Sequence, residues 1–274
     1  MKTLYISDLD GTLLNSGAEI SEFTQDTLSK LLLQGLNFTI ATARTAATAI
    51  QILNKLNIHV PIILMNGVCV YDICKGSYVK IEPLEKTSCS NFFNVLEKYN
   101  LSGFLYSIDD NKLSTFYENT NTPNARGFIE ERTKKFGKIF TKIVSFMTCL
   151  NSGLVYFSVS DKKEKLEPAY NELITDKNIH LEFYRDIYTE NYWYLEICSI
   201  NASKSNAVNF LRDKYEYDEI ISFGDNLNDI SMFLASDESY AVANAKQEVK
   251  ERATGVIESN DDDGVAKFIL KANL

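Results

Sequence analysis

The sequence has few of the residues that build disulfide frameworks, zinc sites or histidine-dependent catalytic groups. Its 274 residues include five cysteines and two histidines. The histidines, His59 and His180, are too far apart and too isolated to indicate a His-rich metal site or a Ser-His-Asp triad. The cysteines form no Cys-x-x-Cys pair, so we expect buried, reduced thiols rather than disulfides or zinc ligands.

Long apolar runs and an excess of positive charge are also missing. No stretch reaches the roughly 18 to 20 apolar residues that span a bilayer, and Asp8 and Asp10 interrupt any candidate signal peptide. The 28 basic residues are outnumbered by 37 acidic ones, which gives a net charge of −9 at pH 7. This balance lacks the electrostatic footprint of a protein that binds nucleic acid or an anionic membrane. We therefore expect a cytoplasmic protein with neither partner.

Strand and helix patterns alternate at both ends of the chain, which is typical of a parallel sheet built from βαβ units. In the first third, the expected strands are 3–7, 37–42 and 61–65, and the expected helices are 21–34 and 46–56. The alternation returns after Tyr192, with strands at 193–197, 219–223, 240–242 and 255–257, and helices at 203–214, 228–234, 246–253 and from about 264.

The middle of the chain has a different character. A hairpin is expected over 104–117, further strands at 143–148, 154–160 and 180–184, and helices at 90–99 and 162–173. The sequence therefore predicts one parallel-sheet domain formed by 1–82 and 191–274, with an α+β domain, 83–190, inserted into it.

The first candidate site, Asp8-Leu9-Asp10-Gly11-Thr12, follows the first predicted strand, where ligands gather in an open parallel sheet. A carboxylate is ionised at neutral pH and can attack phosphorus without a neighbouring base, provided that cations offset the charge of the phosphate. The second carboxylate can act as a general acid toward the leaving alcohol and then as a base toward water. The alternative interpretation is a solvated acidic turn.

A second acidic group, Gly224-Asp225-Asn226-Leu227-Asn228-Asp229, also follows a predicted strand. Its carboxylates are hard oxygen ligands that suit Mg²⁺ better than zinc, although such loops also serve as turns and caps. Four acids at one sheet edge would destabilise the fold without a cation. Lys204 follows the candidate N-cap Ser203, and Thr42 follows the second strand. Taken alone, Lys204 fits a surface lysine and Thr42 fits a strand-end hydroxyl.

Together these motifs resemble the haloacid dehalogenase superfamily. The resemblance is carried by the ordered motifs Asp8-x-Asp10-Gly-Thr, Ala41-Thr42-Ala43-Arg44, Lys204 and Gly224-Asp225-x-x-Asn228-Asp229, supported by Asn66-Gly67, Asn244-Ala245 and Asp263-Gly264-Val265. The long insert between the second and third motifs is similar to the type IIB, Cof-type branch. The resemblance implies an α/β Rossmannoid core with a parallel sheet and an inserted α+β cap of type C2B.

The resemblance also implies an activity and its residues. It implies an Mg²⁺-dependent phosphatase of small phosphorylated metabolites, such as sugar phosphates or phosphorylated cofactors, with Asp8 as the nucleophile and Asp10 as the acid/base. The implied metal ligands are Asp8, the Asp10 backbone carbonyl and Asp225, with Asp229 in support. The implied phosphoryl-binding groups are Thr42, Lys204, Asn228 and the backbone amides of Leu9 and Ala43. Arg44 and Asn66 are candidates for the substrate side.

Two positions depart from the family pattern, and two other functions stay open. Ala43 and Ser205 stand where the family commonly has glycine, and Ala43 narrows the room beside the phosphate. A phosphomutase could use the same aspartyl phosphate, and a non-catalytic sensor could bind a phosphometabolite, although a sensor has no use for Asp10.

The insert would be a cap that selects the leaving group. Its basic residues could face an anionic substrate, although such a run also fits a solvated helix face. The candidates in or beside the insert are Arg126, Arg132, Lys134, Lys135, Lys138, Arg185, Tyr192, Trp193 and Tyr194.

Overall fold

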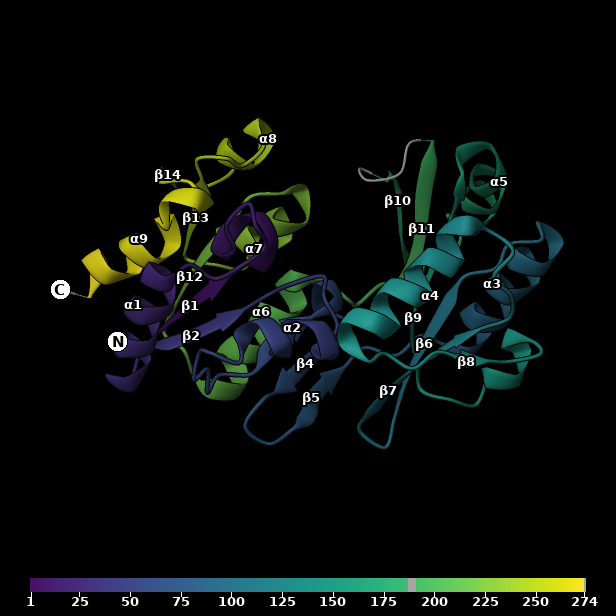
Figure 1. Cartoon of the computed structure of the whole chain (residues 1–274), viewed down its shortest axis with the longest axis horizontal. Helices are drawn as coiled ribbons and strands as arrows, with labels where there is room; N and C mark the ends of the chain where they lie inside the picture. Colours follow the sequence, from purple (N-terminus) through teal and green to yellow (C-terminus); the bar gives the residue numbers. More distant parts are fainter. Residues whose placement is uncertain (187–190, 274) are drawn as a thin grey trace. The chain divides into compact units, whose positions relative to one another are not determined.

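The computed structural model describes residues 1–186 and 191–273. The chain folds into two compact units, shown in Figure 1. The first unit contains both chain ends, Met1–Lys80 and Ser203–Leu274, and the second is the continuous segment Ile81–Ala202.

A five-stranded parallel sheet forms the centre of the first unit. Its strands, in the order β14-β13-β12-β1-β2, are Gly255–Ile257, Glu238–Val242, Glu219–Gly224, Thr3–Ser7 and Asn37–Ile40. β1 lies between β12 and β2, and its last residue, Ser7, is in register with Phe223 and Ile40. The residues that follow these three strands therefore leave the sheet at the same edge, as the parallel arrangement predicts.

Helices cover this sheet, and the cap at one of them sets where that helix begins. They are α1 (Glu22–Leu33), α2 (Ala46–Leu53), α6 (Lys204–Tyr215), α7 (Ile230–Leu234), α8 (Gln247–Lys250) and α9 (Gly264–Ala272). Phe268 of α9 packs on the rings of Phe223 and Tyr240, with centroid distances of 5.4 and 4.3 Å. The hydroxyl of Ser203 accepts a hydrogen bond from the Asn206 amide, so α6 begins at Lys204, as the sequence indicated.

A small sheet in the first unit contains a left-handed turn. Its strands are β3 (Ile62–Leu64), β4 (Cys69–Asp72) and β5 (Ser77–Ile81), and Ile63 also bridges to Ala41 beside β2. Between β3 and β4, Met65, Asn66 and Gly67 have φ angles of 51°, 55° and 97°. This conformation is costly for the two residues that have a side chain, and such strain is found where surrounding contacts enforce it.

The second unit contains a six-stranded sheet in the order β10-β11-β9-β6-β7-β8. The strands are Ile179–Arg185, Tyr192–Ser199, Leu154–Lys162, Phe104–Asp109, Lys112–Tyr117 and Thr141–Lys142, all antiparallel except for the pair β7 and β8. The helices are α3 (Lys86–Lys98), α4 (Pro123–Phe136) and α5 (Lys163–Leu173). Phe92, Phe157, Leu166 and Leu195 are among the buried side chains of its core.

Two expectations are corrected in the second unit. The segment 143–148 is not a strand: Phe146–Cys149 is a short 3-10 turn, because Ser145 accepts a hydrogen bond from the Met147 amide and Phe146 packs on Phe157. The strand expected near Trp193 forms as β11, but it pairs with β9 and β10 of this unit rather than with the parallel sheet.

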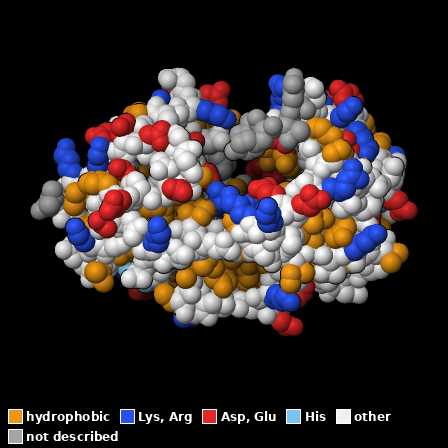
Figure 2. Space-filling view, viewed as in Figure 1, with side chains coloured by type: hydrophobic (Ala, Val, Ile, Leu, Met, Phe, Trp, Pro, Cys, Tyr) orange, Lys and Arg blue, Asp and Glu red, His pale blue; other side chains and the backbone are white. Residues whose placement is uncertain are grey.

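The surface carries charges of both signs, and most of the cysteines are buried. Acidic and basic side chains are interspersed on the face shown in Figure 2. Four cysteines are buried as expected, whereas Cys74 is exposed. Among the described residues, no helix combines the length and the apolar character needed to cross a membrane.

We predict that Gly67→Ala destabilises the protein far more than Gly35→Ala. Both glycines have a positive φ, 97° and 94°, so each methyl group costs about 1 kcal/mol through the backbone. A Cβ at Gly67 would also lie 2.1 Å from the Ser203 carbonyl oxygen, whereas none of the described atoms lies within 4 Å of a Cβ at Gly35. Urea unfolding of both variants measures the difference, and equal losses would contradict the proposed backbone contact.

Candidate active site

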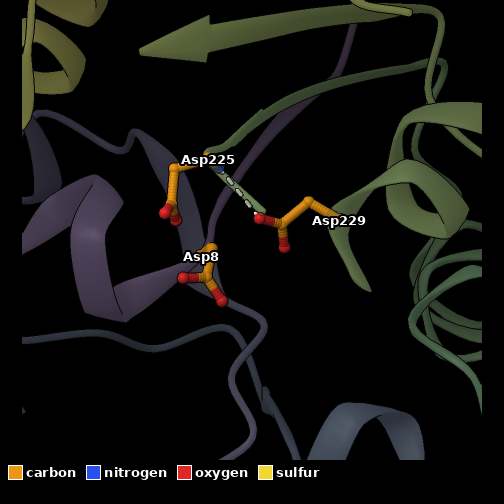
Figure 3. A group of neighbouring side chains, drawn as sticks. All are labelled: Asp8, Asp225 and Asp229. Carbon is orange, nitrogen blue, oxygen red and sulfur yellow. Dashed lines mark hydrogen bonds between the residues drawn. The ribbon is translucent and has the colours of Figure 1, made fainter. Parts of the chain in front are cut away.

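Three aspartates converge at the carboxyl edge of the parallel sheet, as Figure 3 shows. Asp8 continues β1, since its amide donates to the Phe223 carbonyl of β12 at 2.9 Å. Asp225 follows β12 directly, and Asp229 ends the short 3-10 turn Leu227–Asp229 that comes next. One carboxylate oxygen from each of the three residues lies within 4.8 Å of the others, and Asp8 and Asp229 are buried.

Lys204 links two of these carboxylates. Its Nζ donates to Asp8 Oδ1 at 2.6 Å and to Asp229 Oδ1 at 2.7 Å. Only 1% of the lysine side chain is exposed, so this ammonium is part of the interior and not of the surface. The alternative interpretation of Lys204 as a surface lysine is therefore wrong.

Asp229 also fixes the loop in which it lies. Its Oδ2 accepts hydrogen bonds from the backbone amides of Asp225 and Asn226, at 2.9 and 3.0 Å. Thr12 donates to Asp225 Oδ1 at 2.9 Å, so a residue of the first motif orients a carboxylate of the last. Both oxygens of Asp229 are engaged, whereas Asp8 and Asp225 each keep one oxygen that accepts no hydrogen bond from the described residues.

The electrostatics follow from burial. Burial, reinforced by the charges of Asp229 and Asp225, raises the pKa of Asp8 well above its ordinary value, and the nearby Lys204 offsets only part of this effect. Burial likewise raises the pKa of Asp225 to about 6. Burial alone would lower the pKa of Lys204, but the charges of Asp229 and Asp8 outweigh it and raise that pKa. The site therefore holds more negative charge than its lysine neutralises.

Asp10 and Arg44 form a second ion pair on the same edge. Arg44 Nε donates to Asp10 Oδ2 at 2.7 Å and Nη2 donates to Oδ1 at 2.6 Å. The Asp10 side chain is 49% exposed, in contrast to Asp8. Arg44, expected on the substrate side, thus contacts Asp10 directly.

The remaining candidates of the first unit are joined by hydrogen bonds. Thr42 is buried; its hydroxyl accepts from the Arg44 amide, and its carbonyl accepts from the Asn66 amide. Asn228 Nδ2 donates to Asn66 Oδ1 at 3.1 Å. Leu9 is buried and Ala43 is exposed. The second and fourth motifs are therefore connected through Asn66 in the left-handed turn.

Asn244, to which the sequence assigned no role, also lies near the site. Asn244 Nδ2 donates to the Gly11 carbonyl at 2.8 Å, and its Oδ1 accepts from the Asn260 amide. Asn244 therefore holds the turn after Asp10. Its place just after a short strand was the available signal, because a polar side chain there reaches the same sheet edge.

The candidates of the insert belong to the second unit and differ in their surroundings. Lys138 lies over the rings of Tyr106 and Phe140, at 4.5 and 5.0 Å, and Arg132 lies over Phe128 at 5.3 Å. Trp193 is half-buried and packs on Phe183, with a ring centroid distance of 4.9 Å. The exposed members of the set are Arg126, Lys134, Lys135 and Arg185. Tyr192 and Tyr194 are half-buried strand residues.

The donor set fits a hard divalent cation. Carboxylate oxygens are the ligands that Mg²⁺ prefers, and the unengaged oxygens of Asp8 and Asp225 belong to side chains that converge in Figure 3. Burial raises the pKa of both residues, and the charge of Asp229 adds to the effect, so a bound cation would favour their ionised forms. Both oxygens of Asp229 accept hydrogen bonds, from Lys204 and from two backbone amides, so Asp229 fits a supporting role better than that of a ligand.

Comparison with known proteins gives the family. The sequence model of haloacid dehalogenase-like hydrolases matches residues 5–269, so the chain belongs to this family. A 5-amino-6-(5-phospho-D-ribitylamino)uracil phosphatase of Bacillus subtilis, YwtE, is 29% identical over 288 residues, covering 98% of this chain and 97% of the relative. The pyridoxal phosphate phosphatase YbhA of Escherichia coli is 22% identical, covering 96% of this chain and 95% of the relative.

A solved structure supports the same fold. A haloacid dehalogenase-like hydrolase from Bacteroides thetaiotaomicron matches with a TM-score of 0.80 at 23% identity, covering 100% of both chains. The predicted α/β fold and the predicted family are thus confirmed, and the protein is a hydrolase.

We predict that Lys204→Met destabilises the protein by about 3 to 5 kcal/mol at pH 8, because it leaves two buried carboxylates without their cation. The pKa of Asp8 is raised by folding, so the cost of its charge grows as the pH rises through that pKa. The loss should therefore shrink as the pH is lowered. Denaturant unfolding between pH 5 and 8 measures this trend.

The matched control is Lys267→Met, which removes an exposed ion pair with Glu258. Exposed pairs contribute little, so this variant should keep nearly the same stability at every pH. A pH-independent loss in Lys204→Met would contradict the charge argument.

Proposed function

We propose that this protein is an Mg²⁺-dependent phosphatase that hydrolyses small phosphorylated metabolites through an aspartyl phosphate on Asp8. The observation that carries the proposal is the state of the Asp8 carboxylate: buried, held at one oxygen by Lys204, and free to react at the other. This carboxylate lies at the sheet edge where ligands bind in parallel α/β folds.

In the first step, an oxygen of Asp8 attacks phosphorus in line with the ester oxygen. A bond forms between Asp8 and phosphorus, the ester bond breaks, and Asp10 gives a proton to the departing oxygen. Mg²⁺ held by Asp8, Asp225 and the Asp10 carbonyl would supply positive charge that offsets the repulsion between carboxylate and phosphate. Lys204 adds a fixed positive charge at Asp8 Oδ1.

In the second step, water replaces Asp8 on phosphorus. Asp10, now ionised, takes a proton from the water, whose oxygen attacks the acyl phosphate. The bond between phosphorus and the Asp8 oxygen breaks, which releases inorganic phosphate and restores the carboxylate. Asp10 suits both steps because its carboxyl is half-exposed and lies two residues from the nucleophile.

The phosphoryl oxygens would be bound by Thr42, Lys204, Asn228 and the amides of Leu9 and Ala43. Lys204 and Asn228 support this assignment, because one contacts Asp8 and the other is tied through Asn66 to the loop of Thr42. Asp229 would orient Lys204, since it accepts a hydrogen bond from the same ammonium.

We infer that the substrate is a phosphorylated cofactor, a related precursor or a sugar phosphate. The two named relatives act on 5-amino-6-(5-phospho-D-ribitylamino)uracil and on pyridoxal phosphate, both small molecules with one phosphate. The second unit, Ile81–Ala202, would be the cap that selects the leaving group. A cytoplasmic location would suit such substrates.

We predict that Asp8→Asn abolishes turnover, because an amide is too weak a nucleophile toward phosphorus. Lys204 still pairs with Asp229 in this variant, so the fold should be retained. Asp10→Asn should lower turnover by about 100-fold or more, the usual contribution of a general acid and base. Steady-state assays with a phosphate-ester panel measure both effects.

The matched control is Asp261→Asn, an exposed acid that contacts Ser16, which should keep wild-type turnover. Near wild-type activity in Asp8→Asn would refute the nucleophile. Conversion of a hexose 1-phosphate into the 6-phosphate, without release of inorganic phosphate, would favour the phosphomutase over the phosphatase.

We predict that Mg²⁺ stabilises the wild-type protein and not Asp225→Asn, since a ligand that binds only the folded state raises its stability. The stabilisation should weaken as the pH falls below about 6, because a proton then competes for Asp225. Thermal unfolding with and without Mg²⁺ at pH 5.5 and 7.5 measures this. An unchanged Mg²⁺ effect in Asp225→Asn would contradict the assignment.

A further inference from the structure

We propose that Arg44 is the positioning residue for Asp10, and that it acts in the reaction through Asp10 alone. This inference rests on the proposed function, in which Asp10 is the acid and base. It assigns to Arg44 a role other than binding the phosphoryl group or the leaving group.

The geometry of the ion pair carries the proposal. Arg44 presents two parallel donors, Nε and Nη2, to the two oxygens of Asp10, at 2.7 and 2.6 Å. A planar, two-point contact of this kind fixes the orientation of a carboxylate as well as its position. Without it, a carboxylate that is 49% exposed would sample several rotamers.

Arg44 can orient Asp10 because its own backbone is anchored on both sides. Its amide donates to Thr42 Oγ1 at 3.2 Å, and its carbonyl accepts from the Met65 amide at 3.1 Å. Met65 begins the left-handed turn that ends at Gly67, where the chain lies against the backbone of Ser203 and Lys204. The backbone that carries the Arg44 side chain is therefore tied, through this turn, to the segment Ser203–Lys204 at the start of α6.

The backbone of Asp10 is anchored from the other side. Gly11 has a φ of 81°, and a Cβ at this position would lie 2.7 Å from Asp225 Oδ2. Asn244 holds the Gly11 carbonyl. The turn after Asp10 is thus fixed, and what remains free is the side chain, which is the part that Arg44 holds.

A purely structural role would have a different signature. The first unit contains another arginine and aspartate pair, Arg212 and Asp237, in which Asp237 also accepts from the Ile220 amide and Arg212 donates to the Ala235 carbonyl. That pair ties backbone segments together. Asp10 presents its carboxylate to Arg44 from a turn that other contacts already fix, so the pair adds little to stability.

The experiment compares kcat/KM for two leaving groups in Arg44→Gln. Dinitrophenolate leaves without a proton, whereas an alkoxide needs one from Asp10. We expect kcat/KM to fall about 100-fold for the best alkyl phosphate substrate and to stay within about threefold for 2,4-dinitrophenyl phosphate. Arg44→Lys keeps the charge but loses the two-point contact. With the alkyl phosphate, its kcat/KM should therefore lie between those of the wild type and Arg44→Gln.

A double-mutant cycle tests whether Arg44 acts only through Asp10. We expect Asp10→Asn/Arg44→Gln to be no slower with the alkyl phosphate than Asp10→Asn alone. Arg212→Gln is the matched control, and it should leave kcat/KM unchanged for both leaving groups. Urea unfolding checks that each variant is folded.

Three results would overturn the proposal: equal losses for both leaving groups, no loss for either, or a further loss in the double variant. Equal losses would indicate that Arg44 binds the phosphoryl group. Failure of the proposed function looks different, because Asp10→Asn alone would then retain wild-type kcat/KM with the alkyl phosphate.

Discussion

A lysine buried between two buried carboxylates is the interaction on which the site depends. Lys204 contacts Asp8 and Asp229 at 2.6 and 2.7 Å, and all three side chains are largely removed from water. Two carboxylates and one ammonium leave a net negative charge, which is costly in the interior. Backbone amides offset the part on Asp229, so the excess falls on Asp8 and its neighbour Asp225. A cation is the ligand that this excess of negative charge favours.

The parallel sheet is what allows distant segments to share that charge. β1 and β12 are adjacent and in register, so Asp8 and Asp225 leave the sheet at one edge although more than two hundred positions separate them. Lys204 reaches the same edge because the Ser203 cap starts α6 there. Gly67 permits this approach, since its lack of a side chain lets the turn after β3 lie against the Ser203 backbone.

The sequence predicted most strands and helices of the first unit because the signals for these elements lie within short segments of the chain. The strand at Thr3–Ser7, the cap at Ser203 and the acidic turn after Phe223 each have a short-range signal, and their order carried the family resemblance. The partners of Arg44 and Asn66 could not be predicted in this way. Arg44 meets Asp10, and Asn66 meets Asn228, only because separate loops are brought together by the sheet and by a left-handed turn.

Most strands and helices of the second unit also formed where the sequence predicts them, including the hairpin β6–β7 and the helices α3 and α5. The pKa values of its buried side chains, in contrast, depend on packing in the folded unit. Burial raises the pKa of Glu196 to about 7, and Glu182, opposite it on the neighbouring strand, adds to the effect. Burial, with Arg132 nearby, lowers the pKa of Lys138 to about 8. Neither residue lies in a motif, and the strand that carries Glu196 was expected in the other sheet. Because burial in the folded unit is the main cause of both shifts, these pKa values follow from the fold and could not be predicted from a sequence motif.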